Sequence, residues 1–230
     1  MILLTFALPH ESGKFLPKLK AKIWHQRGAL PIVEGHFEGR RVSVIHTGMG
    51  PQRASQSTGA FLAQNRPKLL IASGYAGGLD ERLPAGRLII GENFSDPALM
   101  AVAGRHSGVF IGTLTTQAQV AETTADKLHL AKETGAVAVD METSAIHEHC
   151  RRYSVPMISI RAISDPVQTS MPVPSHVWFD EGRQKPRILP LLAYLGRRPA
   201  RIPHFAKFVG GTNLARKELT AFLCAFLRGL

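Results

Sequence analysis

The sequence has 230 residues, of which 44% are hydrophobic and 20% charged, and it carries a formal net charge of +11. This length accommodates one α/β domain with a well-filled core plus an appendage, whereas two full domains would be cramped. The two cysteines, Cys150 and Cys224, are far apart, which excludes a disulfide framework and CxxC metal spacing and favours a reducing compartment.

Targeting and membrane signals are weak. Residues 1–12 contain an apolar run with no basic segment before it, so they predict a strand rather than a signal peptide. No apolar run reaches the ~18 to 20 residues that a membrane-spanning helix needs. We therefore expect a cytoplasmic protein.

Strand-like and helix-like segments alternate along the chain. Strands are predicted, in chain order, at Ile2–Leu8, Val42–His46, Leu69–Ser73, Leu88–Ile90, Val109–Ile111, Ala136–Val139 and Met157–Ile163. Helices are predicted at Ser12–Trp24, Pro51–Asn65 and Thr143–Tyr153. This alternation predicts an α/β fold with a mainly parallel sheet.

Acidic residues follow two consecutive strand-like runs. Glu142 comes just after Ala136–Val139, and Asp165 comes just after Met157–Ile163. With the helix between them these segments predict a βαβ unit, in which side chains beyond the carboxyl ends of the strands meet ligands. Arg161 lies four residues before Asp165 in the same strand and is expected on the same face, to hold a carboxylate or an anion or to form a buried salt bridge.

Several motifs together resemble one enzyme superfamily. They are Met141-Glu142, the run Arg161–Asp165, the glycine turn His46–Gly50 and the glycine turn Ala72–Leu79. These motifs are similar to the signature of the purine nucleoside phosphorylase and methylthioadenosine/S-adenosylhomocysteine nucleosidase superfamily, and the resemblance covers most of the chain. It implies a three-layer α/β/α fold with a central mixed, mainly parallel sheet. It also implies a nucleoside phosphorylase or nucleosidase that acts on a small-molecule purine nucleoside, as a homo-oligomer and most often a dimer.

Within the superfamily, the chain most resembles the hopanoid-associated nucleoside phosphorylase branch. This likeness is carried by Lys127–Leu130, by Gly135–Glu142 and by the segment Arg197–Pro203. It implies cleavage of the N-glycosidic bond of an adenosyl nucleoside by phosphate, with a hydrophobic substrate such as adenosylhopane. A hydrolytic methylthioadenosine/S-adenosylhomocysteine nucleosidase is the alternative. An inactive module of the same fold that binds a membrane surface or nucleic acid is an alternative of another class.

The resemblance also implies roles for the acidic residues. Asp165 would donate a proton towards the imidazole ring of the purine, although Ser-Asp-Pro is also ordinary turn chemistry. Glu142 would accept hydrogen bonds from the ribose hydroxyls, with Met141 packing on the sugar. Glu11, after the first strand, would orient the attacking water. Glu142 and Glu11 also suit the positive end of a helix dipole, where glutamates are common without any catalytic role.

Other candidates are polar groups near the glycine turns. Gly77 and Tyr75 of the glycine turn Ala72–Leu79, and Gln117, are further candidates for substrate contact. Tyr75 stands where many members of the superfamily have a serine. The Gly-Asp-Pro-x-Arg phosphate loop of the hexameric phosphorylases is missing. A glycine turn that leads into a helix can bind phosphate, so Gly48, Gly50, Arg53 and His10 are the phosphate candidates.

No resident cofactor or metal is expected. His147 and His149 are two residues apart on a predicted helix and would face different sides, which is a poor arrangement for zinc. Inorganic phosphate is the one expected co-substrate, and nucleic acid is not expected as a partner.

The positive charge is concentrated near the C-terminus. Residues 183–230 contain ten lysine and arginine residues against a single acidic residue, Glu218. We therefore predict a catalytic domain at 1–182 and a basic, partly helical appendage at 183–230. The appendage would pack its apolar side on the domain, or contact lipid, a partner or nucleic acid, which would allow a peripheral position on the inner face of the membrane. Trp178 and Phe179 lie just before the appendage, and the sequence leaves open whether they belong to the core, to a lid or to an interface.

Overall fold

The computed structural model describes residues 1–27, 30–180 and 182–230. One large mixed sheet runs through the molecule in the order β2-β3-β4-β1-β5-β10-β6-β7, and β9 joins both β5 and β8. Its strands are β1 (Ile2–Phe6), β2 (Lys20–Arg27), β3 (Leu30–Phe37), β4 (Arg40–His46), β5 (Leu69–Gly78), β6 (Leu88–Gly91), β7 (Val109–Gly112), β8 (Leu114–Thr116), β9 (Ala138–Asp140) and β10 (Met157–Asp165). The central pairs β4-β1, β1-β5 and β5-β10 are parallel.

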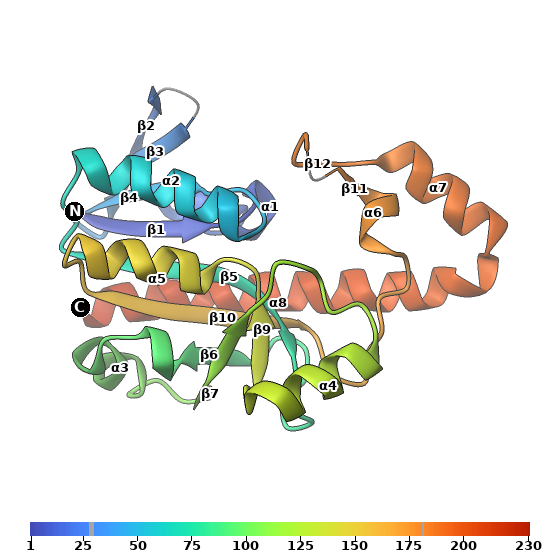
Figure 1. The fold of residues 1–230 in the computed structure, drawn as a ribbon. Coiled ribbons are helices and arrows are strands. Elements are labelled where there is room, and N and C mark those ends of the chain that lie inside the picture. Colours follow the sequence, from blue (N-terminus) through green and yellow to red (C-terminus); the bar gives the residue numbers. More distant parts are fainter. Residues whose placement is uncertain (28–29, 181) are drawn as a thin grey trace.

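Helices cover both faces of this sheet (Figure 1). They are α1 (Pro9–Ser12), α2 (Pro51–Gln64), α3 (Pro97–Ala103), α4 (Thr124–Thr134), α5 (Thr143–Arg152), α6 (Ser175–Trp178), α7 (Ile188–Arg197) and α8 (Ile202–Gly229), with single 3-10 turns at Leu16–Lys18, Glu92–Phe94 and Pro199–Arg201. The predicted three-layer α/β/α fold with a mixed, mainly parallel sheet is confirmed.

Alternating side chains of the strands supply two separate cores. On β1, Leu3 packs with α2 and α5, whereas Ile2 and Leu4 pack with α8 on the opposite face. Because both faces are covered, every residue of β10 is buried. Asp165, the last residue of β10, is therefore buried as well.

The helix predicted at Ser12–Trp24 is wrong. Only Pro9–Ser12 and the turn Leu16–Lys18 are helical, and Lys20–Arg27 is strand β2, paired antiparallel with the unpredicted strand β3. The side chains of Ile23 and Trp24 are 58% and 65% exposed on this edge strand. Pairing with β3, the next segment of the chain, therefore decides the conformation here, and the periodicity of Ser12–Trp24 alone did not reveal it.

The predicted parallel βαβ unit is also wrong. Strand β10 pairs with β5 in parallel, but β9 pairs with β5 antiparallel at Gly77 and Gly78. The two strands therefore flank the same long strand with opposite directions. The register of β10 also shifts between Ile163 and Asp165, which turns the end of that strand relative to β5.

The C-terminal segment does not follow the boundary predicted at residues 182 and 183. The second half of α8 contributes Ala215, Leu219, Leu223, Phe226 and Leu227 to the core beneath the sheet. Another part of the C-terminal segment extends away from the sheet (Figure 1). It contains α6, the small hairpin β11–β12 (Phe179–Asp180 and Lys185–Pro186), α7 and the start of α8. No helix in the described residues has the length and apolar character required to cross a membrane.

Candidate active site

A cavity of about 440 Å³ lies where the ends of β5 and β10 meet the extended C-terminal part. Four buried acidic residues line it: Glu11 from α1, Asp140 from the end of β9, Glu142 from the residue before α5, and Asp165 from the end of β10. Of the residues predicted from the sequence, the lining includes His10, Glu11, Tyr75, Gly77, Met141, Glu142 and Asp165. Glu142, which lies after β9, and Asp165, at the end of β10, therefore line the same cavity, although β9 and β10 are not parallel neighbours.

Glu11 is held by backbone amides and by an arginine. Its Oε2 accepts a hydrogen bond from the amide of Leu8 at 2.9 Å, and its Oε1 accepts one from the amide of Tyr75 at 3.1 Å. Burial raises the pKa of Glu11, while these amides and Arg161 oppose that rise. Glu11 is therefore held by two backbone amides and has a pKa above its ordinary value.

A glycine explains how Glu11 and Arg161 fit together. A Cβ atom at Gly74 would lie 2.5 Å from Nη1 of Arg161 and 3.0 Å from Oε1 of Glu11. Any larger residue at position 74 would push these charged groups apart. The glycine turn at this strand is therefore needed for packing beneath the cavity.

Arg161 does not reach the cavity. Its fully buried guanidinium lies 2.7 Å from Oδ2 of Asp140, donates to Oγ1 of Thr143 at 2.7 Å, and lies 3.8 Å from Oε2 of Glu142. Arg161 therefore supports the carboxylates from behind, as the buried salt-bridge interpretation predicts, and it does not share a face with Asp165. Asp140, which the sequence analysis did not single out, is the acceptor that anchors it.

Glu142 connects the glycine turn His46–Gly50 to the cavity. Its Oε1 accepts a hydrogen bond from the amide of Gly50 at 2.9 Å. Burial, and secondly the charge of Asp140, raise the pKa of Glu142 to about 8, against the opposing effect of Arg161. Near neutral pH this side chain therefore carries a proton for much of the time.

The raised pKa of Glu142 predicts a specific pH dependence of stability. A carboxyl whose pKa is higher in the folded than in the unfolded protein stabilises the fold at low pH, and this contribution is lost as the pH rises from about 4.5 to about 8. Wild type should therefore lose several degrees more in Tm than Glu142→Gln between pH 5 and pH 9. Thermal unfolding followed by circular dichroism at both pH values measures this difference. Parallel decreases in the two proteins would contradict it.

Asp165 is held by a lysine and a serine. Nζ of Lys127 lies 2.5 Å from Oδ2 of Asp165, and the Ser164 hydroxyl donates to Oδ1 at 2.5 Å. Burial raises the pKa of Asp165, and Lys127 and Ser164 oppose this rise. Lys127 belongs to a motif that marked the family resemblance, but nothing in the sequence predicted its contact with Asp165.

The predicted phosphate turn is occupied by the protein's own acceptors. Besides the bond from Gly50 to Glu142, the amide of Met49 donates to Oε1 of Gln184 at 2.6 Å. The guanidinium of Arg53 donates to the carbonyl of Gly182 at 2.9 Å. Gly48, Gly50 and Arg53 do not line the cavity, whereas Met49 and the predicted His10 do.

Gln117 is not part of the cavity wall. Its side chain lies 3.5 Å from Oγ1 of Thr115, and the residues just after it, Gln119 to Ala121, line the cavity instead. His10 and Tyr75 form an edge-to-face pair at the cavity, with the Tyr75 hydroxyl 3.4 Å from Nδ1 of His10. Burial raises the pKa of Tyr75, so its hydroxyl stays protonated and can donate.

The C-terminal part supplies the apolar side of the cavity. Trp178 and Phe179, whose role the sequence left open, both line it, together with Met171, Phe205 and Phe208. The sequence analysis assigned the last two residues to an appendage. Their position shows that α8 contributes to the cavity with its first half and to the core with its second half.

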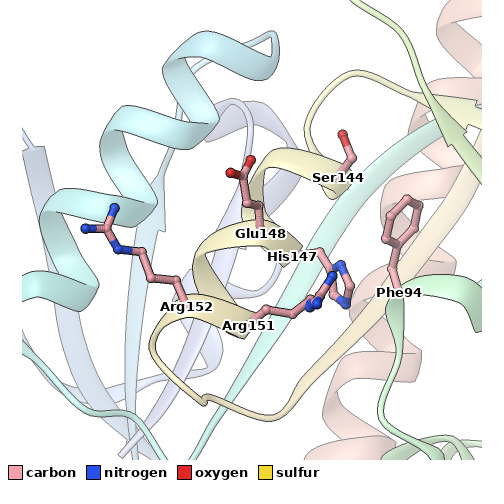
Figure 2. Close-up of a pocket in the computed structure, with 6 residues that line it drawn as sticks. All are labelled: Phe94, Ser144, His147, Glu148, Arg151 and Arg152. Carbon is pink, nitrogen blue, oxygen red and sulfur yellow. The ribbon is translucent and has the colours of Figure 1, made fainter.

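A second, open depression of about 430 Å³ lies on α5 (Figure 2). It is lined by Phe94, Ser144, His147, Glu148, Arg151 and Arg152. Its walls come mainly from side chains along one exposed helix, and Glu11, Glu142 and Asp165 do not contribute to it. In the part of the chain that the structure describes, no group of three or more metal-binding side chains is placed to hold a metal ion.

Comparison with protein families identifies the chain. The sequence model of the phosphorylase superfamily matches residues 2–108 and 94–185, which together cover most of the chain. The chain belongs to the phosphorylase superfamily. The superfamily predicted from the motifs is confirmed, and with it the enzyme class of nucleoside phosphorylases and nucleosidases. The hopanoid-associated branch stays a prediction.

Three similar solved structures align with this chain over its whole length. The 5'-methylthioadenosine/S-adenosylhomocysteine nucleosidase of Neisseria meningitidis, in complex with methylthio-immucillin-A, is 19% identical with a TM-score of 0.76, over 100% of this chain and 99% of that one. The Streptococcus pneumoniae enzyme with 8-aminoadenine is 17% identical with a TM-score of 0.77, over 100% and 99%. The native futalosine hydrolase of Helicobacter pylori is 17% identical with a TM-score of 0.75, over 100% and 97%. These structural similarities confirm the fold of this chain.

Proposed function

We propose that this enzyme cleaves the N-glycosidic bond of a purine nucleoside. Asp165 donates a proton to the leaving purine, Glu142 accepts hydrogen bonds from the ribose, and Glu11 activates the nucleophile. The observation that carries this proposal is the convergence of Glu11, Glu142 and Asp165, three of the four buried acidic residues that line the cavity, from separate elements. The superfamily match and the purine analogues bound by similar structures support the same reaction.

Water is the nucleophile that this arrangement favours. Two amides of the predicted phosphate turn already donate to Glu142 and Gln184, so a phosphate would have to displace protein acceptors there. Glu11, by contrast, is already positioned beside the cavity and can take a proton from a bound water. Phosphorolysis, the mode expected from the sequence, is the second candidate.

The substrate we propose carries a large hydrophobic group on its 5′ carbon, as adenosylhopane does. The acidic residues serve the base and the sugar, while the rest of the wall is largely apolar, with Trp178, Phe179, Phe205 and Phe208. An apolar wall of this kind stabilises a hydrophobic group through the area removed from water. Methylthioadenosine and S-adenosylhomocysteine are the smaller alternatives, named for the similar nucleosidases.

A single assay of adenine release tests the reaction and its mode. Purified enzyme is given methylthioadenosine, S-adenosylhomocysteine and an adenosyl nucleoside with a long apolar 5′ group, each with and without phosphate. We expect release without phosphate, and a higher kcat/KM for the apolar nucleoside. Release that depends on phosphate would establish phosphorolysis, and no release from any nucleoside would refute the proposed function.

For such a substrate we propose that α7 contacts an anionic membrane surface. On α7, Ile188, Leu189 and Leu192 are 55%, 79% and 59% exposed. Arg197 and Arg198 follow at its end and are exposed as well. Exposed apolar side chains beside arginines favour the boundary of a bilayer with anionic headgroups. The neighbouring hairpin and α8 line the cavity, so a lipid-linked nucleoside would enter beside this surface.

Point substitutions test this contact, because removing residues 183–230 would also remove core residues of α8. Wild type should sediment with anionic vesicles at low salt and less at high salt. Arg197→Glu/Arg198→Glu should weaken binding on the order of tenfold or more, and Leu189→Ser/Leu192→Ser should also weaken it. Ile23→Ser, at an exposed position on β2 far from α7 in Figure 1, is the matched control. Binding that ignores lipid charge or the α7 substitutions would refute the membrane contact.

A further inference from the structure

The interior of α4 contains an unusual buried charge. Lys127 is the one buried residue of this helix, and its side chain has no exposed surface. A lysine is almost never fully buried unless its ammonium group is paired, because removing a charge from water is costly. The burial of the Lys127 ammonium group therefore depends on polar partners and not on packing alone.

The ammonium group of Lys127 is fully satisfied by acceptors around the end of β10. It lies 2.5 Å from Oδ2 of Asp165, and it also donates to the carbonyls of Pro166 at 3.0 Å, Thr169 at 2.9 Å and Asp165 at 3.3 Å. Lys127 does not line the cavity, whereas Asp165 does. Any effect of Lys127 on a bound nucleoside must therefore pass through Asp165.

The two buried cations of this region serve different carboxylates. Arg161 pairs with Asp140 and Glu142, and Lys127 pairs with Asp165. The Ser164 hydroxyl also donates a hydrogen bond to the Asp165 carboxyl. Each carboxylate oxygen has two lone-pair positions, so Oδ1 can still face the cavity while Ser164 occupies one of them.

The other charged groups of α4 do not compete for this carboxyl. Asp126 is exposed and caps the start of the helix by accepting from the amide of Thr123, and exposed His129 pairs with Glu133 at 3.2 Å. Across the cavity, Glu11 bonds to backbone amides. Lys127 is thus the cation placed to respond when the charge of Asp165 changes.

We propose that Lys127 is a positioning residue for glycosidic cleavage, which orients the Asp165 carboxyl and stabilises the carboxylate that remains after Asp165 has given its proton to the purine. This inference rests on the proposed function. As the bond from C1′ to the purine nitrogen breaks, its electron pair goes to the purine and the Asp165 proton moves to the imidazole ring. Lys127 stays protonated beside the new carboxylate, while the nucleophile bonds to C1′ and Glu11 takes the proton of the water.

Removing the lysine should make Asp165 a weaker acid. Burial raises the pKa of Asp165 and Lys127 opposes that rise, so without Lys127 the proton is held to higher pH. We expect Lys127→Met to lower kcat by about tenfold to a hundredfold with little change in KM. The basic limb of the rate profile should move to higher pH. Lys127→Gln, which can still donate to the carbonyls, should show the same kinetic change if Lys127→Met folds poorly.

A double-mutant cycle separates this role from a structural one. If Lys127 acts through Asp165, then Lys127→Met should cost less than about threefold when it is made in Asp165→Asn. Removing both charges also avoids leaving one buried and unpaired, so the double variant should fold. Lys132→Met, at an exposed position of the same helix, is the matched control and should keep the wild-type rate and pH profile.

The outcomes are distinguishable. An active wild type whose folded Lys127→Met and Lys127→Gln variants keep the wild-type pH profile would overturn this inference alone. Additive losses in the cycle would overturn it as well, because they would show that Lys127 acts independently of Asp165. A wild type that releases no purine would instead overturn the proposed function and this inference together.

Discussion

Replacing Asp165 by asparagine is expected to lower the turnover of adenine release by about 10²-fold or more. An amide has nearly the same shape as the carboxyl but cannot pass a proton to the leaving purine. The three carbonyl oxygens around Lys127 remain in this variant, so the buried ammonium keeps most of its acceptors. The measurement is kcat for an adenosyl nucleoside, beside circular dichroism spectra that compare the fold with wild type.

The matched control for this variant is Asp80→Asn. Asp80 follows β5, is half-buried, and pairs with the exposed Arg82 at 2.6 Å, away from the cavity lining. It should keep the wild-type turnover because exposed ion pairs contribute little. Near-normal adenine release by folded Asp165→Asn would remove Asp165 from the mechanism.

Glu11→Gln is expected to lower turnover by about 10²-fold or more when water is the nucleophile. Both carboxylate oxygens of Glu11 accept from backbone amides, so a glutamine would be unable to take a proton and would also place its own amide group against one of these donors. KM should change less than kcat, because the loss concerns activation of water. The measurement is single-substrate kinetics in phosphate-free buffer.

The same variant also distinguishes the two nucleophiles. Phosphate is already a nucleophile near neutral pH, so a phosphorolytic enzyme should lose much less activity in Glu11→Gln when phosphate is present. Glu148→Gln, on the exposed side of α5 in Figure 2, is the control for a general effect of removing a glutamate. Equal rates of Glu11→Gln and wild type in phosphate-free buffer would exclude Glu11 as the base.

The amino-acid sequence alone predicted the fold class, which the structure confirms, and it singled out three acidic residues that the structure places on the cavity wall. Short apolar, β-branched runs such as Val42–His46 and Met157–Ile163 form strands because their composition suits burial on both faces, and the structure confirms strands at both. Glu142 and Asp165 were singled out because each comes just after a predicted strand, where a sheet presents its ligand-binding edge, and Glu11 was singled out by the family resemblance. These features depend on the order and type of neighbouring residues, which the sequence contains directly.

The partners of those residues depend on how the whole chain packs. Lys127 meets Asp165 across 38 residues of sequence, and Gly50 gives its amide to Glu142 across 92. The strand conformation of Lys20–Arg27 depends on pairing with β3, and Phe205 reaches the cavity because the second half of α8 is anchored in the core. Periodicity describes which face of its own element a residue occupies. It does not reveal which donor, acceptor or apolar surface elsewhere in the chain that face contacts, because those contacts depend on tertiary packing.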